Sequence, residues 1–98
     1  MPNDMKSLLQ SKRDKILAVA AQYGATNVRV FGSVARGENA DRSDIDILLE
    51  LEPGRSLLDH VALWQDLQDL LQCEVDVITE KALHPALREK ILKEAIPL

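Results

Sequence analysis

Residues 28–50 decide the fold of this chain, and they read VRVFGSVARGENADRSDIDILLE. Apolar runs rich in β-branched residues stand at its two ends, over 28–31 and 44–51, and each has the length of a strand. Gly32-Ser33 breaks the first run, and a short helical turn and a polar loop are predicted over 34–43. The segment therefore predicts two strands joined by a wide, hairpin-like return.

Amphipathic helices are predicted on both sides of this segment. Upstream, apolar residues recur every three or four positions from Leu8 to Tyr23, with Ser7 as a candidate N-cap and Gly24 as a stop. Downstream, a helix capped by Ser56 carries an apolar stripe of Leu57, Val61, Trp64, Leu67 and Leu71. We expect Trp64 to belong to the core as part of that stripe.

A third strand is predicted over 74–78, where apolar and acidic residues alternate strictly. The last helix should run from Pro85 to Ala95, since proline suits a first helical turn. The order is then helix, strand, turn, strand, helix, strand, helix. It predicts an α/β (α+β) fold, a small mixed sheet of about three strands backed by helices. At 98 residues the chain is expected to be a single domain, 1–98.

Composition narrows the possible functions. The formal net charge of −4 argues against direct nucleic-acid binding, because phosphate backbones select lysine and arginine. Cys73 is the single cysteine, so neither an internal disulfide nor a cysteine zinc site is expected. No apolar run approaches the roughly 20 residues that cross a bilayer, and the first residues do not resemble a signal peptide. We therefore expect a cytoplasmic protein that does not bind membranes.

Three aspartates stand in predicted strands, where aspartate is depleted. Asp44 and Asp46 are two residues apart and share one face of their strand, roughly 6.6 Å apart along it. Asp76 stands between two valines in the third strand and projects to one face as well. If the two strands are neighbours, all three carboxylates can converge. The alternative is that Asp44 ends a turn while Asp46 and Asp76 merely face solvent.

Converged carboxylates repel one another unless cations neutralise them. Magnesium is the natural candidate, since it prefers oxygen ligands and is often shared between carboxylates and substrate phosphates. Two such ions can hold the attacking and leaving oxygens of an in-line displacement. The candidate catalytic and metal-binding residues are therefore Asp44, Asp46 and Asp76, with Mg²⁺, in two ions, as the expected cofactor.

The break after the first strand is a candidate phosphate-binding turn. Gly32 allows a ligand to approach the backbone closely, and Ser33 supplies a hydroxyl next to successive N–H groups. Arg36 follows three residues later and could reach a phosphate oxygen, although a lone arginine is as often a solvated surface residue. A glycine-serine pair alone is common in turns, so its weight comes from its spacing to Asp44, with ten residues between Ser33 and Asp44.

This combination resembles the signature of the DNA polymerase β-like nucleotidyltransferase superfamily. Gly32-Ser33 is followed after ten residues by Asp44-Ile45-Asp46, and Asp76 matches the third carboxylate of that superfamily. The longer stretches 30–37 and 43–48 resemble the minimal nucleotidyltransferases (MNT) of prokaryotes, and the resemblance covers almost the whole chain.

The resemblance implies transfer of AMP from ATP to a hydroxyl, with release of pyrophosphate. Asp44 and Asp46 would bind magnesium, and Asp76 would bind the catalytic ion and orient or deprotonate the acceptor. Gly32 and Ser33 would hold the triphosphate. Members of this family often pair with a HEPN-domain toxin, with MNT as the antitoxin, and some transfer AMP onto a tyrosine of that toxin.

Two other functions stay open at this point. The chain could be an antitoxin that acts by binding alone, or a nucleotidyltransferase for a small molecule, for which no acceptor pocket is evident in the sequence. His60 and His84 are not near the aspartates in the pattern, so we expect surface or helix-end roles for them.

Overall fold

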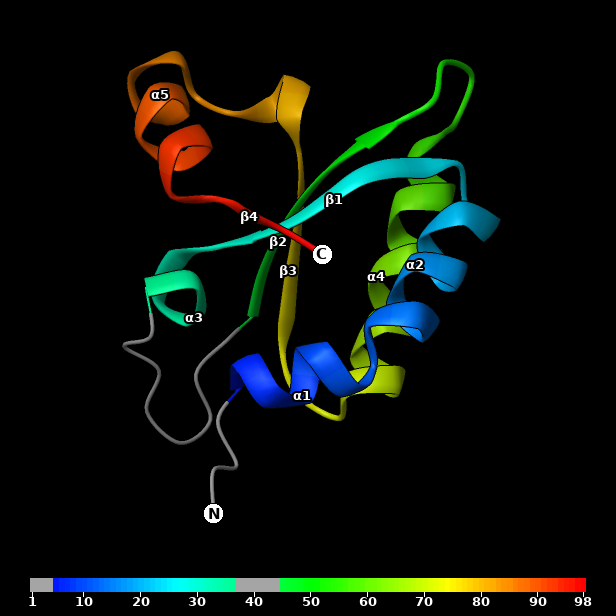
Figure 1. The fold of residues 1–98 in the computed structure, drawn as a ribbon. Coiled ribbons are helices and arrows are strands. Elements are labelled where there is room, and N and C mark those ends of the chain that lie inside the picture. Colours follow the sequence, from blue (N-terminus) through cyan, green and yellow to red (C-terminus); the bar gives the residue numbers. More distant parts are fainter. Residues whose placement is uncertain (1–4, 37–44) are drawn as a thin grey trace.

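A computed structural model describes residues 5–36 and 45–98 of the chain (Figure 1). In chain order the elements are α1 (Met5–Ser11), α2 (Arg13–Gln22), β1 (Ala25–Phe31), α3 (Gly32–Arg36), β2 (Ile45–Leu51), α4 (Leu57–Leu71), β3 (Val75–Thr79), the 3₁₀ turn η1 (Glu80–Ala82), α5 (Pro85–Glu94) and β4 (Ile96–Pro97). The predicted mixed sheet backed by helices is confirmed.

The sheet has the strand order β3-β2-β1-β4. β1 and β2 are antiparallel, which confirms the hairpin-like return, and β2 and β3 are parallel, with α4 as the crossover between them. The fourth strand was not predicted. It is only two residues long and pairs with the middle of β1, at Arg29 and Val30, so no local sequence pattern reveals it.

The predicted first helix is in fact two helices. α1 ends at Ser11 and α2 begins at Arg13, with Lys12 between them. The Ser11 hydroxyl donates to the carbonyl of Leu8, a local bond that competes with regular helix geometry. Ser7 lies inside α1 and is not an N-cap.

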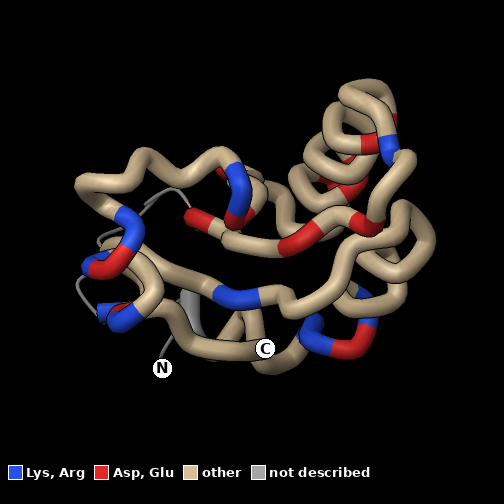
Figure 2. Tube along the Cα trace, turned by 90° about the horizontal axis from the view of Figure 1, so that it is seen from above, with Lys and Arg blue, Asp and Glu red and all other residues tan. Residues whose placement is uncertain are grey.

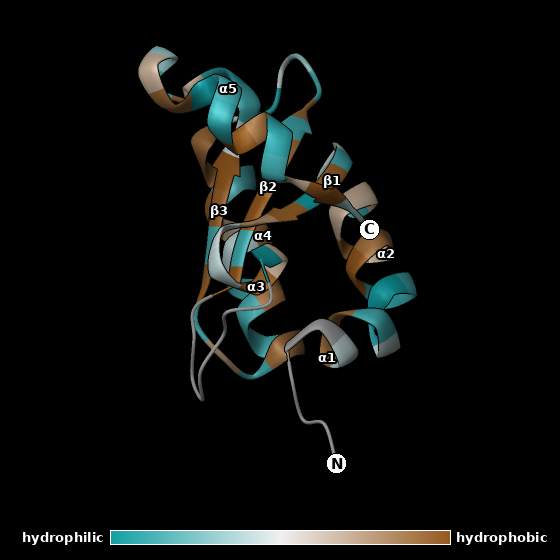
Figure 3. Ribbon diagram, turned by 60° about the vertical axis from the view of Figure 1, so that its left-hand side comes forward, coloured by the Kyte–Doolittle hydropathy of each residue, from teal (hydrophilic) through white to brown (hydrophobic). Residues whose placement is uncertain are grey.

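Each face of the sheet packs against different helices (Figure 1). α1, α2 and α4 cover one side, called the α4 face, and α5 covers the other, called the α5 face. Alternation along the strands supplies both cores, and the strands form the hydrophobic centre of the molecule (Figure 3). Buried on the α4 face are Val28, Val30, Ile45, Ile47, Leu49, Val75 and Val77. The α5 face has a smaller cluster of Phe31, Leu48 and Leu83, with Ile78, Ile91, Leu92 and Ala95 packed against it.

Side chains of α4 cover the outer edge of β3. The Trp64 indole N–H donates to the carbonyl of Val75 at 2.6 Å, and His60 Nε2 lies 2.9 Å from the carbonyl oxygen of Val77. Gln68 Oε1 accepts from the Val75 N–H at 3.1 Å. His60, Trp64 and Gln68 are spaced by four residues, so they form one row along the helix. We call them the edge row.

The edge row corrects the prediction for Trp64. The core face of α4 consists of Leu63, Leu67 and Leu71, and Trp64 stands beside it with 37% of its surface exposed. Its ring lies at the margin because its N–H must reach a strand carbonyl. Leu57 and Leu58 at the start of α4 are more exposed still. Over residues 5–36 and 45–98, no helix is long and apolar enough to cross a membrane.

Candidate functional site

Asp46 and Asp76 face each other across the two parallel strands. β2 and β3 are in register with Asp46 opposite Asp76, flanked by the pairs Ile45–Val75 and Ile47–Val77. Burial of those four apolar side chains on the α4 face directs both aspartates to the α5 face. Asp46 is half-buried and Asp76 exposed. The predicted juxtaposition of these two residues is thus present in the structure.

The third predicted carboxylate, Asp44, lies outside the described residues. The described part of the chain contains no group of three His, Cys, Asp or Glu side chains that could hold a metal ion. Asp46 and Asp76 by themselves supply carboxylate oxygens from neighbouring strands, the ligand type that magnesium prefers. This pair therefore fits a magnesium ion, and the convergence of Asp44 with it stays a prediction.

The glycine-serine turn lies directly against Asp46. Phe31, the last residue of β1, is the register partner of Asp46, and Gly32 follows it with φ +77°. A Cβ atom on Gly32 would overlap the Asp46 carboxylate. Only glycine combines this left-handed backbone with such a close approach. The backbone of the predicted phosphate turn is therefore in contact with a predicted metal ligand.

α3 holds the other two residues that were predicted to bind nucleotide. It is a single turn from Gly32 to Arg36, and its middle residues Val34 and Ala35 are buried on the α4 face. This burial fixes the turn to the sheet. Ser33 is half-buried, and Arg36 stands at the exposed end of the helix.

A carboxylate that the sequence reasoning missed joins both ends of α3. Glu94, the last residue of α5, accepts a hydrogen bond from the Gly32 N–H at 2.8 Å through Oε2. Its Oε1 is 2.9 Å from Arg36 Nη1 in an ion pair. The Glu94 side chain is 18% exposed and that of Arg36 43%. Glu94 is 58 residues from Arg36 in the chain, so no spacing rule signals the contact.

The electrostatics of this contact favour the ionised carboxylate. Burial alone would raise the pKa of Glu94, but the hydrogen bond from Gly32 and the hydrogen bond and charge of Arg36 outweigh it, and the pKa lies below its ordinary value. A carboxylate at the C-terminal end of a helix is otherwise unfavourable, because the helix dipole is negative there. Gly32 and Arg36 compensate for that.

A second glutamate anchors the other end of the α5 face. Glu80 Oε1 lies 2.9 Å from Arg29 Nη2, and Glu80 Oε2 lies 3.3 Å from Arg88 Nη2. Arg29 is the one charged residue among the buried side chains of the described chain, at 9% exposure. Its Nη2 makes no hydrogen bond of good geometry within the described residues, so the contact with Glu80 is an ion pair. Along the chain trace, lysine and arginine positions stand next to aspartate and glutamate positions at several places (Figure 2).

The two histidines are not part of this site. His84 is exposed and caps α5, where its Nδ1 accepts from the Ala86 N–H, which confirms the predicted helix-end role. His60 is half-buried in the edge row, on the outer side of β3. Cys73 is half-buried.

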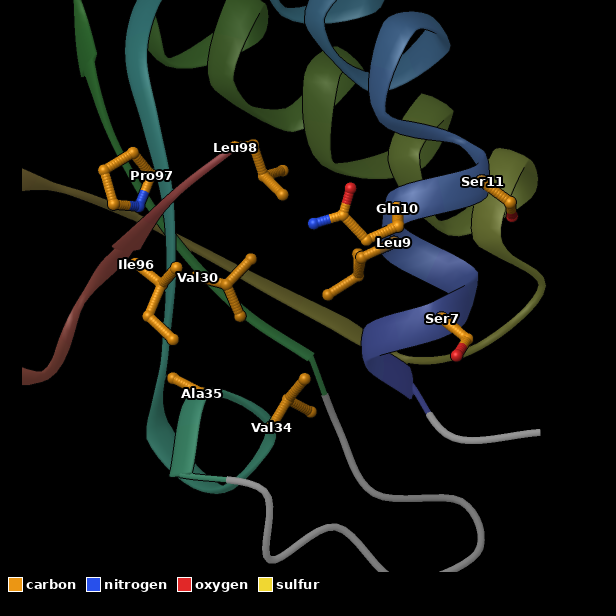
Figure 4. A pocket seen from close by; sticks show the side chains of 10 residues that line it. All are labelled: Ser7, Leu9, Gln10, Ser11, Val30, Val34, Ala35, Ile96, Pro97 and Leu98. Atoms are coloured by element: carbon orange, nitrogen blue, oxygen red, sulfur yellow. The ribbon is translucent and has the colours of Figure 1, made fainter. Parts of the chain in front are cut away.

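An apolar hollow of about 610 Å³ opens on the opposite side of β1 (Figure 4). It lies between α1, α3 and the last residues of the chain, and its walls include Leu9, Val30, Val34 and Ile96. Val30 points to the α4 face, whereas Asp46 and Asp76 point to the α5 face. The hollow is therefore separated from the aspartates by the sheet itself.

Comparison with known proteins agrees with this geometry. The family model of the nucleotidyltransferase domain matches residues 13–98. A curated relative from Methanocaldococcus jannaschii, named "Putative protein adenylyltransferase", is 45% identical over 82 residues, which is 84% of this chain and 88% of the relative.

Two solved structures share the fold. One, described as a "putative minimal nucleotidyltransferase", has a TM-score of 0.86 and 49% identity, with 97% of this chain and 96% of that chain covered. The other, a toxin-antitoxin crystallised with AMP-PNP, has a TM-score of 0.74 at 21% identity, with 86% of this chain and 69% of that chain covered, and shows the fold alone. The chain belongs to the nucleotidyltransferase domain family and is a nucleotidyltransferase of the minimal type.

Proposed function

We propose that the protein transfers AMP from ATP to a hydroxyl of a partner protein, a HEPN-family toxin, and acts as its antitoxin. The observation that carries this proposal is the in-register pair Asp46 and Asp76 beside the turn at Gly32. Two carboxylates and a close-approach glycine in contact are the parts that phosphoryl transfer needs, namely metal ligands and a phosphate cradle.

The relatives and neighbours support the choice of a protein acceptor. The Methanocaldococcus relative is named as a protein adenylyltransferase. The more distant structural neighbour is a toxin-antitoxin with a bound ATP analogue. A protein acceptor would bring its own binding surface to the exposed Asp76 side chain. The HEPN identity of the partner comes from the resemblance to the minimal nucleotidyltransferases.

The reaction joins the acceptor oxygen to the α-phosphorus of ATP. The bond from the α-phosphorus to the oxygen that bridges to the β-phosphate breaks, and pyrophosphate leaves with that electron pair. Asp76, the more exposed of the pair, would accept or direct the hydroxyl proton. Gly32, Ser33 and Arg36 would hold the triphosphate.

Bound magnesium would neutralise the negative charge of the phosphates. Asp46 and Asp76 would hold it, together with Asp44. Carboxylates beside a triphosphate would otherwise repel it, so the proposed chemistry and the proposed metal depend on each other.

The test combines the protein, ATP labelled on the α-phosphate, magnesium chloride and a HEPN-family protein as the candidate partner. We expect label on a hydroxyl side chain of the partner, found by mass spectrometry as an added AMP, and no label when EDTA replaces magnesium. If the two proteins form a complex and label never reaches the partner, transfer to this partner is wrong.

The variant Asp46→Asn separates catalysis from neutralisation by contact. We expect it to fold, to bind the partner and to lose neutralisation. Neutralisation that survives in this variant would favour an antitoxin that acts by binding alone. Asp69→Asn is the matched control, because Asp69 is exposed on α4, away from the α5 face.

A further inference from the structure

We infer that Glu94 is a positioning residue for the nucleotide site: it holds α3 by both ends and so keeps the glycine-serine turn and Arg36 ready for the triphosphate. This inference rests on the proposed function, because it concerns the same site. It adds a residue from α5, at the far end of the chain, that the site requires.

The geometry of the contact carries the inference. The two oxygens of Glu94 have different partners, the N–H of the first residue of α3 and the guanidinium of its last residue. One side chain therefore spans the whole turn. Since a single helical turn is marginal by itself, a contact that ties its two ends together restricts its conformation strongly.

Two carboxylates also approach Gly32 from different elements. Asp46 of β2 occupies the space where a Cβ would lie, and Glu94 of α5 accepts the N–H. The Gly32 backbone is thereby fixed between the predicted metal ligand and α5. Any shift of Glu94 would change how the following Ser33 N–H and hydroxyl are presented to a phosphate.

Arg36 is oriented by the same contact. Its side chain is 43% exposed, and a long exposed arginine samples many rotamers when nothing holds it. With Nη1 on Glu94, the guanidinium is held beside the turn. Fixing a binding group in advance lowers the entropic cost of ligand binding, and this is the role assigned to Glu94.

The variants Glu94→Ala and Glu94→Gln test this role. Alanine removes both contacts, whereas glutamine retains an acceptor for the Gly32 N–H and loses the ion pair. We expect Glu94→Ala to raise the Kd for AMP-PNP with magnesium, and the KM for ATP, about tenfold, with kcat within about threefold of the unaltered protein. The Kd and KM of Glu94→Gln should lie between those of Glu94→Ala and those of the unaltered protein.

Two control variants on the same structural unit make the result specific. Glu89→Gln removes one negative charge from α5 at an exposed position, where Glu89 forms an ion pair with Lys93, and should leave the Kd unchanged. Glu80→Gln weakens the anchor at the other end of the α5 face and should lower the melting temperature without raising the Kd. A merely structural role for Glu94 would make its variants behave like Glu80→Gln.

Three results would overturn the inference: an unchanged Kd in Glu94→Ala, a Kd raised equally by Glu80→Gln, or tighter nucleotide binding in Glu94→Ala, which would mean that the carboxylate competes with phosphate. If Glu94→Ala does not fold, Glu94→Gln decides the question by the same criteria. Absence of nucleotide binding and of transfer in the unaltered protein contradicts the proposed function instead.

Discussion

Each end of the α5 face has a glutamate that contacts two partners, and the two glutamates have different roles. At one end Glu80 lies between Arg29 and Arg88, and at the other Glu94 lies between Gly32 and Arg36. Both glutamates are largely shielded, with 22% and 18% of their side chains exposed. They fasten η1 and the end of α5 to the sheet and to α3.

The difference lies in what each glutamate holds. The Glu80 partners are two arginines, one of them buried in the middle of β1, and no predicted site residue takes part. The Glu94 partners are both residues predicted to bind nucleotide. An ion pair on this face is therefore informative about function only through its partners. We expect changes at the Glu80 end to act on stability and changes at the Glu94 end to act on the reaction.

The largest effect is expected from Asp76→Asn, which lies at the Glu94 end of the face. It removes a charge from the proposed magnesium site, and we expect the rate of AMP transfer to fall about 10²- to 10³-fold. Because the Asp76 side chain is exposed, the urea midpoint should change little. If Asp76→Asn loses stability but keeps its rate of AMP transfer, the Glu94 end acts on stability and not on the reaction, and the assignment of the two ends is wrong.

A large loss of stability is expected at the Glu80 end from Arg29→Met. Methionine keeps much of the volume but leaves Glu80 with Arg88 alone, and we expect the free energy of unfolding to fall by about 3 kcal/mol. Urea denaturation measures this. Lys93→Met, at an exposed pair, is the control and should cost less than about 0.5 kcal/mol. The KM for ATP should not change in either variant.

Gly32→Ala is expected to affect both the stability and the reaction, because Gly32 contacts Asp46 and belongs to the predicted phosphate turn. The added Cβ meets the Asp46 carboxylate, and φ +77° disfavours any side chain. We expect a loss of about 2 kcal/mol in unfolding free energy, together with weaker AMP-PNP binding. Gly54→Ala is the matched control. It has φ +92° but open space around its Cβ position, so it tests backbone strain alone. Equal losses in the two variants would mean that the Asp46 contact is unimportant.

The smallest effect is expected from pH acting on Glu94. Because its pKa is lowered in the folded protein, its contribution to stability is complete above the unfolded pKa of about 4.3 and is lost as the pH falls through the folded value. Glu94→Gln should be less stable than the unaltered protein by about 1 kcal/mol or less at pH 7. The gap should narrow in urea titrations as the pH falls below the unfolded pKa. A gap that does not narrow with falling pH would contradict this.

Local patterns were sufficient to predict most of the fold. Strict alternation over 74–78 identified β3, and the period of α4 identified the crossover that makes β2 and β3 parallel. Once those two strands are neighbours, the pleat places Asp46 and Asp76 on the same face, whereas their pairing in register is set by the packing of the strands. Gly32 stood out because a glycine ended an otherwise regular strand.

The missed features all depend on contacts between distant segments. β4 forms only because residues 96–97 return to β1, and the Trp64 side chain is at the margin because a strand carbonyl attracts its N–H. Glu94 is one of several charged residues on the last helix, and no local pattern distinguishes it from them. Its role is set by Gly32 and Arg36, and neither is near it in the sequence.

The edge row has a consequence for how this protein meets others. An exposed edge strand can pair with a strand of another molecule, and such pairing leads to fibres or to domain swapping between copies. Here Trp64 and His60 already occupy outward carbonyls of β3, and at the opposite margin Pro97 has no N–H to offer. Main-chain pairing with another strand is therefore closed at these positions, and a partner that meets the sheet there would contact side chains.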